Sequence, residues 1–357
     1  MTQNTTVGIV GAGNRVKSFY APILKQLDGF EIAGFTARTE KTRENFEKES
    51  GIASFDSVAS LCEESPDFII VCVRSSSLRE VLEPILERNI PFLVETPVED
   101  LSLAQEIANS NVKAGVVEQW PYLPIEQFKK MLINRGLVGD VFIVENDCRL
   151  FDYHGIAQIR QYLARGITPR YLSAVTTARY LPEFLDSNGE SKNLLENWDI
   201  GFIKFSDDSV LLHKFSYNCK VAPFRPLQSV RIIGTSGSII TACIDSKNND
   251  FEIFKVHCNI NGETHSLPVQ IDRDGQIIKR IVCEVPDAEP VVWENKFIDK
   301  NFDRHSVGIA THIVEMKNYI DNKRATPLYG FADVFTDMVI LYGIKQSGQT
   351  GQPIGFK

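Results

Sequence analysis

Two glycines near the amino terminus have the spacing of a turn that binds phosphate groups. Gly11 and Gly13 directly follow the apolar segment 7–10 and precede residues with helical periodicity. Glycines in this position let the backbone approach a diphosphate, whose charge is stabilised by the free N–H groups at the helix start. Val16 stands where a third glycine or alanine is common, so an ordinary strand-to-helix turn is the alternative. The residues expected to bind the diphosphate are Gly11, Gly13, Asn14 and Arg15.

The end of the second apolar strand distinguishes between two nicotinamide dinucleotides. An acidic side chain there would bind the ribose hydroxyl of NAD, whereas an arginine accommodates the 2′-phosphate of NADP. The sequence at this point is Thr36-Ala37-Arg38, with Ala37 in the expected acidic position. NADP is therefore favoured over NAD, with Thr36 and Arg38 as contacts. The alternative for Arg38 is a solvated residue at the start of a helix.

Polar residues also follow two further strands predicted in the same region. Arg74 and Ser75 come after the apolar run 68–73, and Glu95 and Thr96 close the segment that begins at residue 91. Ligands of open parallel sheets bind at the carboxyl ends of the strands. These four residues are therefore candidates for cofactor contacts.

His154 is the main candidate for proton transfer. A histidine has an unperturbed pKa of about 6.5, which lets it gain or lose a proton near neutral pH. Tyr153, immediately before it, is the second candidate, as a donor through its phenol or as a relay. The alternative for His154 is a structural residue at a helix start, and the five other histidines are predicted to be structural. Asp152, Arg149 and Arg160 are candidates to bind a polar or anionic substrate, with surface salt bridges as the alternative.

Short apolar strands alternate with helical stretches over the first 120 residues. Strands are predicted at 7–10, 30–35, 68–73, 91–95 and 114–117, and helices at 16–27, from 39 onward, at 78–88 and at 101–110. This alternation builds a parallel sheet with helices on both faces. The sequence therefore predicts an α/β fold that begins with a Rossmann doubly wound parallel sheet, and a dinucleotide-binding domain at residues 1–120.

The pattern changes after Trp120, where strands of alternating apolar and polar residues dominate. A helix is predicted at 125–135, strands at 141–146, 201–205, 210–217 and 229–233, and two closing helices at 309–322 and 331–347. Residues 192–198 are interpreted as a polar connection. Residues 121–357 are thus predicted to form an α+β domain with a large open, mostly antiparallel sheet.

Composition narrows the classes of function. The 357 residues carry a formal net charge of −8 without a basic tract, so nucleic acid and membrane surfaces are not expected partners. The seven cysteines have no C-x-x-C pair and no histidine at ligand spacing, so no metal site is expected. Free thiols, a polar amino terminus and the lack of an apolar run of about 18 residues predict a cytoplasmic protein.

Four short motifs occur in order along the chain. They are Gly-Ile-Val-Gly-Ala-Gly at 8–13, Val-Glu-Thr-Pro at 94–97, Tyr-Gly-Phe-Ala-Asp at 329–333 and Ser-Gly-Gln-Thr-Gly at 347–351. Together they resemble the Gfo/Idh/MocA oxidoreductases. The resemblance implies hydride transfer between NADP or NAD and a sugar, polyol or other small hydroxyl or carbonyl substrate, in a cleft between the Rossmann domain and a substrate domain with an open sheet. It also implies a homodimer or homotetramer formed through the outer face of that sheet.

The sequence departs from this family at the expected site. Members usually carry Glu-Lys-Pro where residues 95–97 read Glu-Thr-Pro, so Thr96 removes a cation. Gln119 takes the place of an asparagine near the nicotinamide. Members often carry a histidine and an aspartate one helical turn apart, and two registers would match them here. The matching pairs are His154 with Ala157, or Gly155 with Gln158.

Three functions follow from this resemblance. The first is a dehydrogenase or reductase of a sugar-like or other hydroxylated carbon. The second is an imine reductase of a biosynthetic pathway, which Thr96 suggests because thiazolinyl imine reductases of the same family also lack the lysine. The third is a catalytically silent sensor or regulator that binds the dinucleotide.

Overall fold

The computed structural model describes residues 4–148, 151–164, 166–186, 188–216, 222, 228–243 and 253–356. The chain divides into two compact units. The first contains Met1–Tyr122 and Phe297–Phe335, and the second contains Leu123–Lys296 and Thr336–Lys357. Residues 297–335, which lie beyond the boundary predicted at residue 120, thus pack with the first unit.

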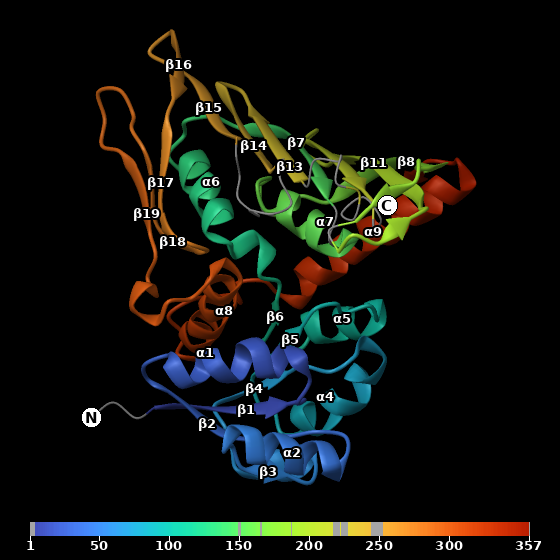
Figure 1. Ribbon diagram of the computed structural model, residues 1–357, viewed down its shortest axis with the longest axis vertical. Coiled ribbons are helices and arrows are strands. Elements are labelled where there is room, and N and C mark those ends of the chain that lie inside the picture. Colours follow the sequence, from blue (N-terminus) through green and yellow to red (C-terminus); the bar gives the residue numbers. More distant parts are fainter. Residues whose placement is uncertain are drawn as a thin grey trace. The chain divides into compact units, whose positions relative to one another are not determined.

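The first unit contains a six-stranded parallel sheet with the order β3-β2-β1-β4-β5-β6 (Figure 1). Its strands are β1 (Thr5–Val10), β2 (Phe30–Thr36), β3 (Ser54–Phe55), β4 (Phe68–Val71), β5 (Phe92–Glu95) and β6 (Ala114–Val117). Every residue of β4 is buried, as expected for a parallel strand covered on both faces. The predicted Rossmann sheet is confirmed, with β3 as an additional short edge strand.

The helices of this unit pack on one another as well as on the sheet. They are α1 (Ala21–Gln26), α2 (Glu40–Ser50), α3 (Val58–Glu63), α4 (Leu78–Glu87), α5 (Leu101–Ala108) and α8 (Arg304–Ile320). Lys25 of α1 donates to the backbone oxygen of Ser50 in α2 at 2.6 Å. Arg79 of α4 forms ion pairs with Asp100, which caps α5, and with Glu106 within α5. Neighbouring helices are therefore linked by polar contacts at the surface.

The helix predicted at 16–27 is divided by a wide turn. The segment η1 (Val16–Tyr20) is π-helical, and the N–H of Ala21 donates to the oxygen of Val16, five residues earlier. The helix α1 follows, with Pro22 in its first turn. Proline has no N–H to donate, which removes one regular α-helical bond at this point.

Hydrogen bonds attach the distant segment 297–335 to the end of the first sheet. The N–H of Val116 in β6 donates to the oxygen of Tyr329 at 2.9 Å. The ammonium of Lys113 donates to the oxygens of Tyr319 and Ile320, at 3.0 and 2.8 Å, where α8 ends. A sequence boundary drawn from periodicity alone does not reveal these long-range bonds.

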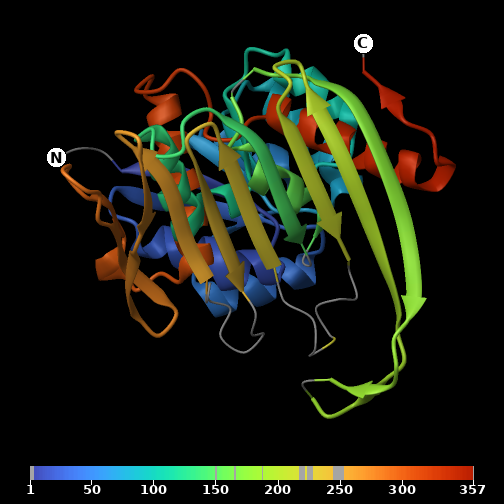
Figure 2. The same ribbon diagram turned by 90° about the horizontal axis from the view of Figure 1, so that it is seen from above.

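The second unit is built on a nine-stranded sheet with the order β16-β15-β14-β13-β7-β12-β11-β8-β20, which Figure 2 shows face on. Its strands are β7 (Val141–Cys148), β8 (Pro169–Tyr180), β11 (Leu195–Phe205), β12 (Val210–Phe215), β13 (Gln228–Gly234), β14 (Gly237–Cys243), β15 (Ile253–Ile260), β16 (Glu263–Leu267) and β20 (Ile354–Gly355). The strands β7 and β12 are parallel, and the other neighbours are antiparallel. The predicted large, mostly antiparallel sheet is confirmed.

The prediction of a polar connection at 192–198 is wrong. The strand β11 begins at Leu195 and pairs with β8 over its whole length, from Leu195 opposite Tyr180 to Phe205 opposite Pro169. Continuous cross-strand pairing in a long hairpin holds this segment extended in spite of its polar composition. Two smaller sheets complete the strands of this unit: β9 (Phe184–Leu185) with β10 (Ser191–Lys192), and β17 (Val269–Asp274), β18 (Ile277–Cys283) and β19 (Val291–Glu294).

Three helices belong wholly or mostly to the second unit. They are α6 (Pro124–Asn134), α7 (Asp152–Arg160) and α9 (Phe331–Thr350). The helix α7 packs on β7 and β12, and the hydroxyl of Ser347 in α9 accepts a bond from the N–H of Ala174 in β8 at 2.9 Å. Trp293 of β19 donates to Gln127 of α6 at 3.3 Å. Within the described ranges, no helix is long and apolar enough to cross a membrane.

Candidate cofactor and active site

The glycine turn after β1 has the geometry that a diphosphate requires. Gly11 has a φ of 117°, and a Cβ there would lie 2.4 Å from the backbone oxygen of Cys72. A side chain at Gly11 would therefore clash with the backbone after β4. A Cβ at Gly13 would meet nothing within 4 Å, and Asn14 beside it is exposed at the start of the helical segment. The turn thus leaves open space beside Gly13.

Gln119 contributes a buried acceptor after β6. Its side chain is 4% exposed, and its Oε1 has no hydrogen-bond partner. A buried amide oxygen without a donor is costly, so the position favours a ligand or water that supplies an N–H or O–H group. Together with the open turn at Gly13, this unpaired atom fits a dinucleotide bound to the first unit.

Glu95 at the end of β5 gathers three side chains around its carboxylate. Tyr20 donates its phenol proton to Oε2, and Nε of Arg15 lies 3.2 Å from the same oxygen. The hydroxyl of Thr96 lies 3.4 Å from Oε1. The predicted residues Arg15, Glu95 and Thr96 thus lie together, and Tyr20 joins them although no sequence pattern pointed to it.

Burial and charge fix the protonation of this cluster. Burial, together with the Glu95 carboxylate, raises the pKa of Tyr20 well above its usual value, so the phenol stays protonated. Burial lowers the pKa of Arg15, but the attraction of Glu95 outweighs it and the net shift is upward. Burial also raises the pKa of the Cys72 thiol well above its usual range. Cys72 is therefore an unreactive thiol at neutral pH.

The end of β2 presents two guanidinium groups. Arg38 is exposed and forms no ion pair or hydrogen bond with the described residues. Arg43 of α2 donates to the backbone oxygen of Ala37 at 3.0 Å and pairs with Asp56 at 3.2 Å. Sequence reasoning missed Arg43, although its position one turn into α2 would have placed it near Ala37. Thr36 is 3% exposed, and its backbone oxygen accepts a bond from the N–H of Gly11 at 2.8 Å.

The two candidates after β4 differ in their surroundings. Arg74 is exposed. The hydroxyl of Ser75, at the start of the 3-10 turn η2 (Ser75–Ser77), accepts a bond from the N–H of Glu99 at 3.0 Å. Ser75 therefore ties the loop after β4 to the loop after β5. A cofactor contact by either residue stays a prediction.

In the second unit, Tyr153 and His154 lie together in the first turn of α7. Their ring centroids are 4.2 Å apart, and His154 is 6% exposed. Lys345 of α9 pairs with Asp152 at 2.8 Å, and the N–H of Tyr153 donates to the same carboxylate at 3.0 Å. This ion pair anchors the turn that carries both catalytic candidates.

Of the other candidate substrate ligands, Arg160 forms an ion pair and Arg149 is not described. Arg160 at the end of α7 pairs with the buried carboxylate of Asp337 in α9. Arg149 lies outside the described residues. Asp152 and Arg160 thus have partners within the second unit, and both hold α7 on α9.

A buried histidine, His213, is linked to the same helix through Asn146. The amide nitrogen of Asn146 in β7 donates to the oxygen of Gly155, so its Oδ1 faces Nδ1 of His213 at 2.8 Å. An amide oxygen only accepts, which puts the proton of His213 on Nδ1. Burial lowers the pKa of His213 to about 4, although Asp152 and Asp147 oppose the shift. His213 is therefore neutral at pH 7, and its Nε2 is a buried acceptor without a partner.

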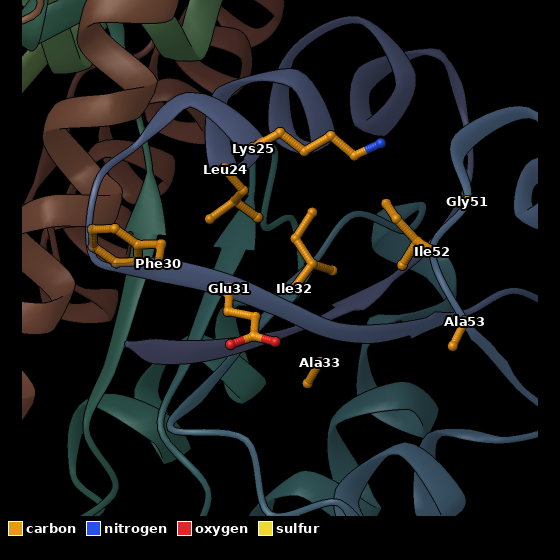
Figure 3. A pocket seen from close by; sticks show the side chains of 9 residues that line it. All are labelled: Leu24, Lys25, Phe30, Glu31, Ile32, Ala33, Gly51, Ile52 and Ala53. Atoms are coloured by element: carbon orange, nitrogen blue, oxygen red, sulfur yellow. The ribbon is translucent and has the colours of Figure 1, made fainter. Parts of the chain in front are cut away.

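A pocket of about 310 Å³ in the first unit lies away from the glycine turn. Figure 3 shows it between the end of α1, the first residues of β2 and the loop before β3. Its lining includes Leu24, Phe30 and Ile52, and none of the predicted cofactor ligands. The carboxyl ends of the strands, where Gly11, Thr36 and Glu95 stand, are therefore a separate region.

Residues 5–120 match the model of the oxidoreductase family with an NAD-binding Rossmann fold, GFO_IDH_MocA. No curated protein sequence matches this chain. No group of His, Cys, Asp or Glu suited to a metal ion occurs among the described residues.

Solved structures of similar fold cover nearly the whole chain. An oxidoreductase from Agrobacterium radiobacter, in complex with NAD+, L-tartaric acid and magnesium, has a TM-score of 0.70 and 16% identity over 99% of this chain and 98% of its own. An aldose-aldose oxidoreductase from Caulobacter crescentus, complexed with glycerol, has a TM-score of 0.66 and 14% identity over 99% of this chain and 100% of its own. An oxidoreductase from Thermotoga maritima has a TM-score of 0.63 and 17% identity over 99% of this chain and 98% of its own.

The family model and the fold agree. The chain is an oxidoreductase whose residues 5–120 form an NAD-binding Rossmann domain of the Gfo/Idh/MocA family. The second sheet, at these low identities, is similar in fold to the solved structures.

Proposed function

We propose that the chain is a dehydrogenase or reductase that binds NADP in preference to NAD and transfers hydride to or from a sugar-like or other small hydroxyl or carbonyl substrate. The observation that supports the preference is the end of β2, where Arg38 is exposed and has no ion pair among the described residues. Arg43 adds a second guanidinium at Ala37. Two guanidinium groups without an acidic residue at 36–39 suit a 2′-phosphate better than a free ribose hydroxyl.

Residues of the first unit hold the dinucleotide in this proposal. The open turn at Gly13, Asn14 and Arg15 receives the diphosphate, and Arg38 the 2′-phosphate. Gln119 accepts a hydrogen bond from the nicotinamide amide through its unpaired Oε1. Thr36, Arg74, Ser75 and Thr96 complete the set of proposed contacts, and Glu95 belongs to the same site through its pair with Arg15. The bound nicotinamide supplies or accepts the hydride.

Proton transfer is assigned to the first turn of α7. His154 gives or takes the proton at the reacting oxygen, and Tyr153 relays it to solvent. The 4.2 Å separation of the two rings supports this pairing, and the ion pair of Lys345 with Asp152 keeps the turn in place. Thr96 supplies no cation at the end of β5, which favours imine reduction as a second candidate reaction.

Calorimetry with NADPH and NADH tests the cofactor assignment. Arg38→Asp should weaken NADPH binding by about 10- to 100-fold, because a charged hydrogen bond to phosphate is lost and a repulsion is added. NADH binding should change by less than about threefold. Arg88→Asp, which makes the same charge change at the end of α4, is the matched control. Equal losses for both dinucleotides, or no loss, would contradict the assignment.

Turnover measurements test the proposed chemistry. A panel of aldoses, polyols, hydroxy acids and cyclic imines is assayed with NADP+ or NADPH. For any substrate found, His154→Asn should lower kcat by about 10²- to 10⁴-fold and leave the Kd of NADPH unchanged. NADPH binding without turnover on the whole panel would favour a silent sensor instead.

We also propose a cytoplasmic homodimer or homotetramer formed through the outer face of the nine-stranded sheet. Three apolar side chains on this face are exposed, namely Tyr171 at 41%, Val175 at 59% and Phe202 at 38%. Contiguous exposed apolar residues are typical of protein interfaces. Sedimentation velocity should therefore show a dimer or tetramer, and Phe202→Asp should shift it toward the monomer. A wild-type monomer at micromolar concentration would refute this proposal.

A further inference from the structure

The wide turn η1 aligns two side chains that a regular helix would separate. Arg15 and Tyr20 are five residues apart, and in an α-helix their side chains would point about 140° away from each other. In a π-helical turn the hydrogen bonds connect residues five apart, as between Val16 and Ala21 here. Both side chains consequently reach Oε2 of Glu95. The irregular turn is thus the local feature that assembles this cluster.

Glu95 serves as an anchor in this arrangement. One of its oxygens accepts from Tyr20 and pairs with Arg15, and the other lies near the Thr96 hydroxyl. The Glu95 side chain is 13% exposed. A carboxylate engaged on both oxygens is poorly placed to accept a proton from a substrate, and well placed to fix its donors.

Arg15 is held at one end only. Its Nε faces Glu95, and its guanidinium lies 4.6 Å from the centroid of the Phe19 ring. The two terminal nitrogens have no hydrogen-bond partner among the described residues, and the side chain is 29% exposed. Arg15 follows Gly13 by two positions, where the turn leaves open space. A planar guanidinium with two free donors is therefore preorganised beside the diphosphate turn.

We propose that Glu95 is a positioning residue that holds the Arg15 guanidinium for a two-point contact with the diphosphate of the dinucleotide. This inference rests on the proposed dinucleotide binding. A guanidinium fork matches phosphate oxygens in geometry, and a fork already fixed by Glu95 and Phe19 loses little freedom on binding. Arg15 thereby supplies charge next to a turn in which Val16 replaces the third glycine.

Binding of NADPH and of ADP, measured by calorimetry, tests the contact. ADP carries the diphosphate without the nicotinamide and its ribose. Arg15→Gln should raise both dissociation constants by about 10- to 100-fold, and Arg15→Lys should recover only part of the loss because an ammonium lacks the fork. Lys17→Gln is the matched control, since it removes a positive charge two residues away that pairs with Glu49. It should change either constant by less than about twofold.

The positioning role of Glu95 has its own readout. Glu95→Gln should weaken both ligands by about 3- to 10-fold, and in the Arg15→Gln background it should have no further effect, because the two residues act as one unit. If Glu95→Gln does not fold, Glu95→Asp keeps the charge, withdraws it from Arg15, and should show the same coupling. Additive losses would overturn the positioning role.

The remaining outcomes separate this inference from the proposed function. A wild-type protein that binds neither NADPH nor NADH refutes dinucleotide binding itself. A wild-type protein that binds NADPH, with Arg15→Gln binding it within twofold, overturns only the role of Arg15. A loss for NADPH without a loss for ADP also overturns it, because Arg15 would then act on the nicotinamide half rather than on the diphosphate.

Discussion

Each unit contains a carboxylate that accepts a hydrogen bond from a tyrosine and pairs with a cation. In the first unit Glu95 binds Tyr20 and Arg15 at the carboxyl ends of the parallel strands. In the second unit Glu126 of α6 takes the same part, with Tyr162 and Lys129 as its partners. Each cluster combines a carboxylate, a tyrosine and a cation, and the two differ in the type of cation and in how far they are enclosed.

The cluster of the second unit is closed. The side chains of Lys129 and Glu126 are 0% and 1% exposed, and their charged atoms are 2.8 Å apart. The Lys129 ammonium also donates to the hydroxyl of Thr241 at 3.2 Å and lies 5.3 Å from the Tyr162 ring centroid. Burial lowers the pKa of Lys129, and the nearby carboxylate opposes that shift. This cluster is surrounded by its own partners and joins α6 to β14.

The cluster of the first unit is open. Arg15 is 29% exposed and keeps two donors that the described residues do not use. A closed ionic group contributes to folding, since its removal leaves a partner charge buried, whereas an open one has donors left for a ligand. The comparison therefore indicates that Glu126 contributes to folding stability and that Glu95 contributes to ligand binding. The residue types alone would suit either role.

The largest expected effect is on stability, from the closed cluster. Glu126→Gln leaves the buried Lys129 without its counter-charge, and we expect the free energy of unfolding to fall by about 3–5 kcal/mol. Urea denaturation followed by circular dichroism measures this loss. The folded fraction should bind NADPH as the wild type does, because this cluster lies in the other unit.

A double variant provides the control for this prediction. Adding Lys129→Met to Glu126→Gln removes the stranded charge, and replacing a buried ion pair with apolar groups is often neutral. Most of the lost stability should return. A loss below about 1 kcal/mol in the single variant would show that the cluster is less enclosed than its exposure indicates.

Enclosed histidines extend the comparison to acid pH. Burial lowers the pKa of His213 and of His312 to about 4 each, from 6.5 in the unfolded chain. The unfolded chain therefore binds more protons between these values, so the stability is fully present above pH 6.5 and is lost as the pH falls toward 4. Each histidine should account for a loss of about 3 kcal/mol over this window.

Variants that keep the hydrogen bond and remove the titration separate the two contributions. His213→Asn can still donate to Asn146, and His312→Gln can still donate to the backbone oxygen of Glu118. Each should flatten the dependence of unfolding free energy on pH between 6.5 and 4, when measured by urea denaturation at several pH values. An unchanged slope in either variant would mean that the histidine concerned is protonated in the folded protein.

The sequence predicted the fold better than the site because the fold signals are local. The alternation of strands and helices before residue 120, and the glycine spacing after β1, depend only on neighbouring residues. The strand β3 has two residues and carries no periodic signal. The start of β11 escaped detection because β8, which holds it extended, lies further back in the sequence.

The parts of the site that sequence reasoning missed depend on distant partners. Tyr20 reads as a core residue of a helix until Glu95, 75 residues later, is placed beside its phenol. Lys129 and Glu126 read as the polar face of α6, and their burial depends on Tyr162 and Thr241. Long-range contacts of this kind leave no pattern in a single sequence.

The smallest expected effects come from removing one hydroxyl from each cluster. Tyr162→Phe should lower the unfolding free energy by about 2 kcal/mol, since it removes a donor to a charged group inside the closed cluster. Tyr20→Phe should cost about 1 kcal/mol, because Arg15 still pairs with the oxygen that Tyr20 leaves. Urea denaturation measures the unfolding free energy of both variants, and calorimetry measures their affinity for NADPH. NADPH affinity should fall slightly in Tyr20→Phe and stay constant in Tyr162→Phe. Equal losses of stability with no change in affinity would mean that enclosure does not distinguish the two clusters.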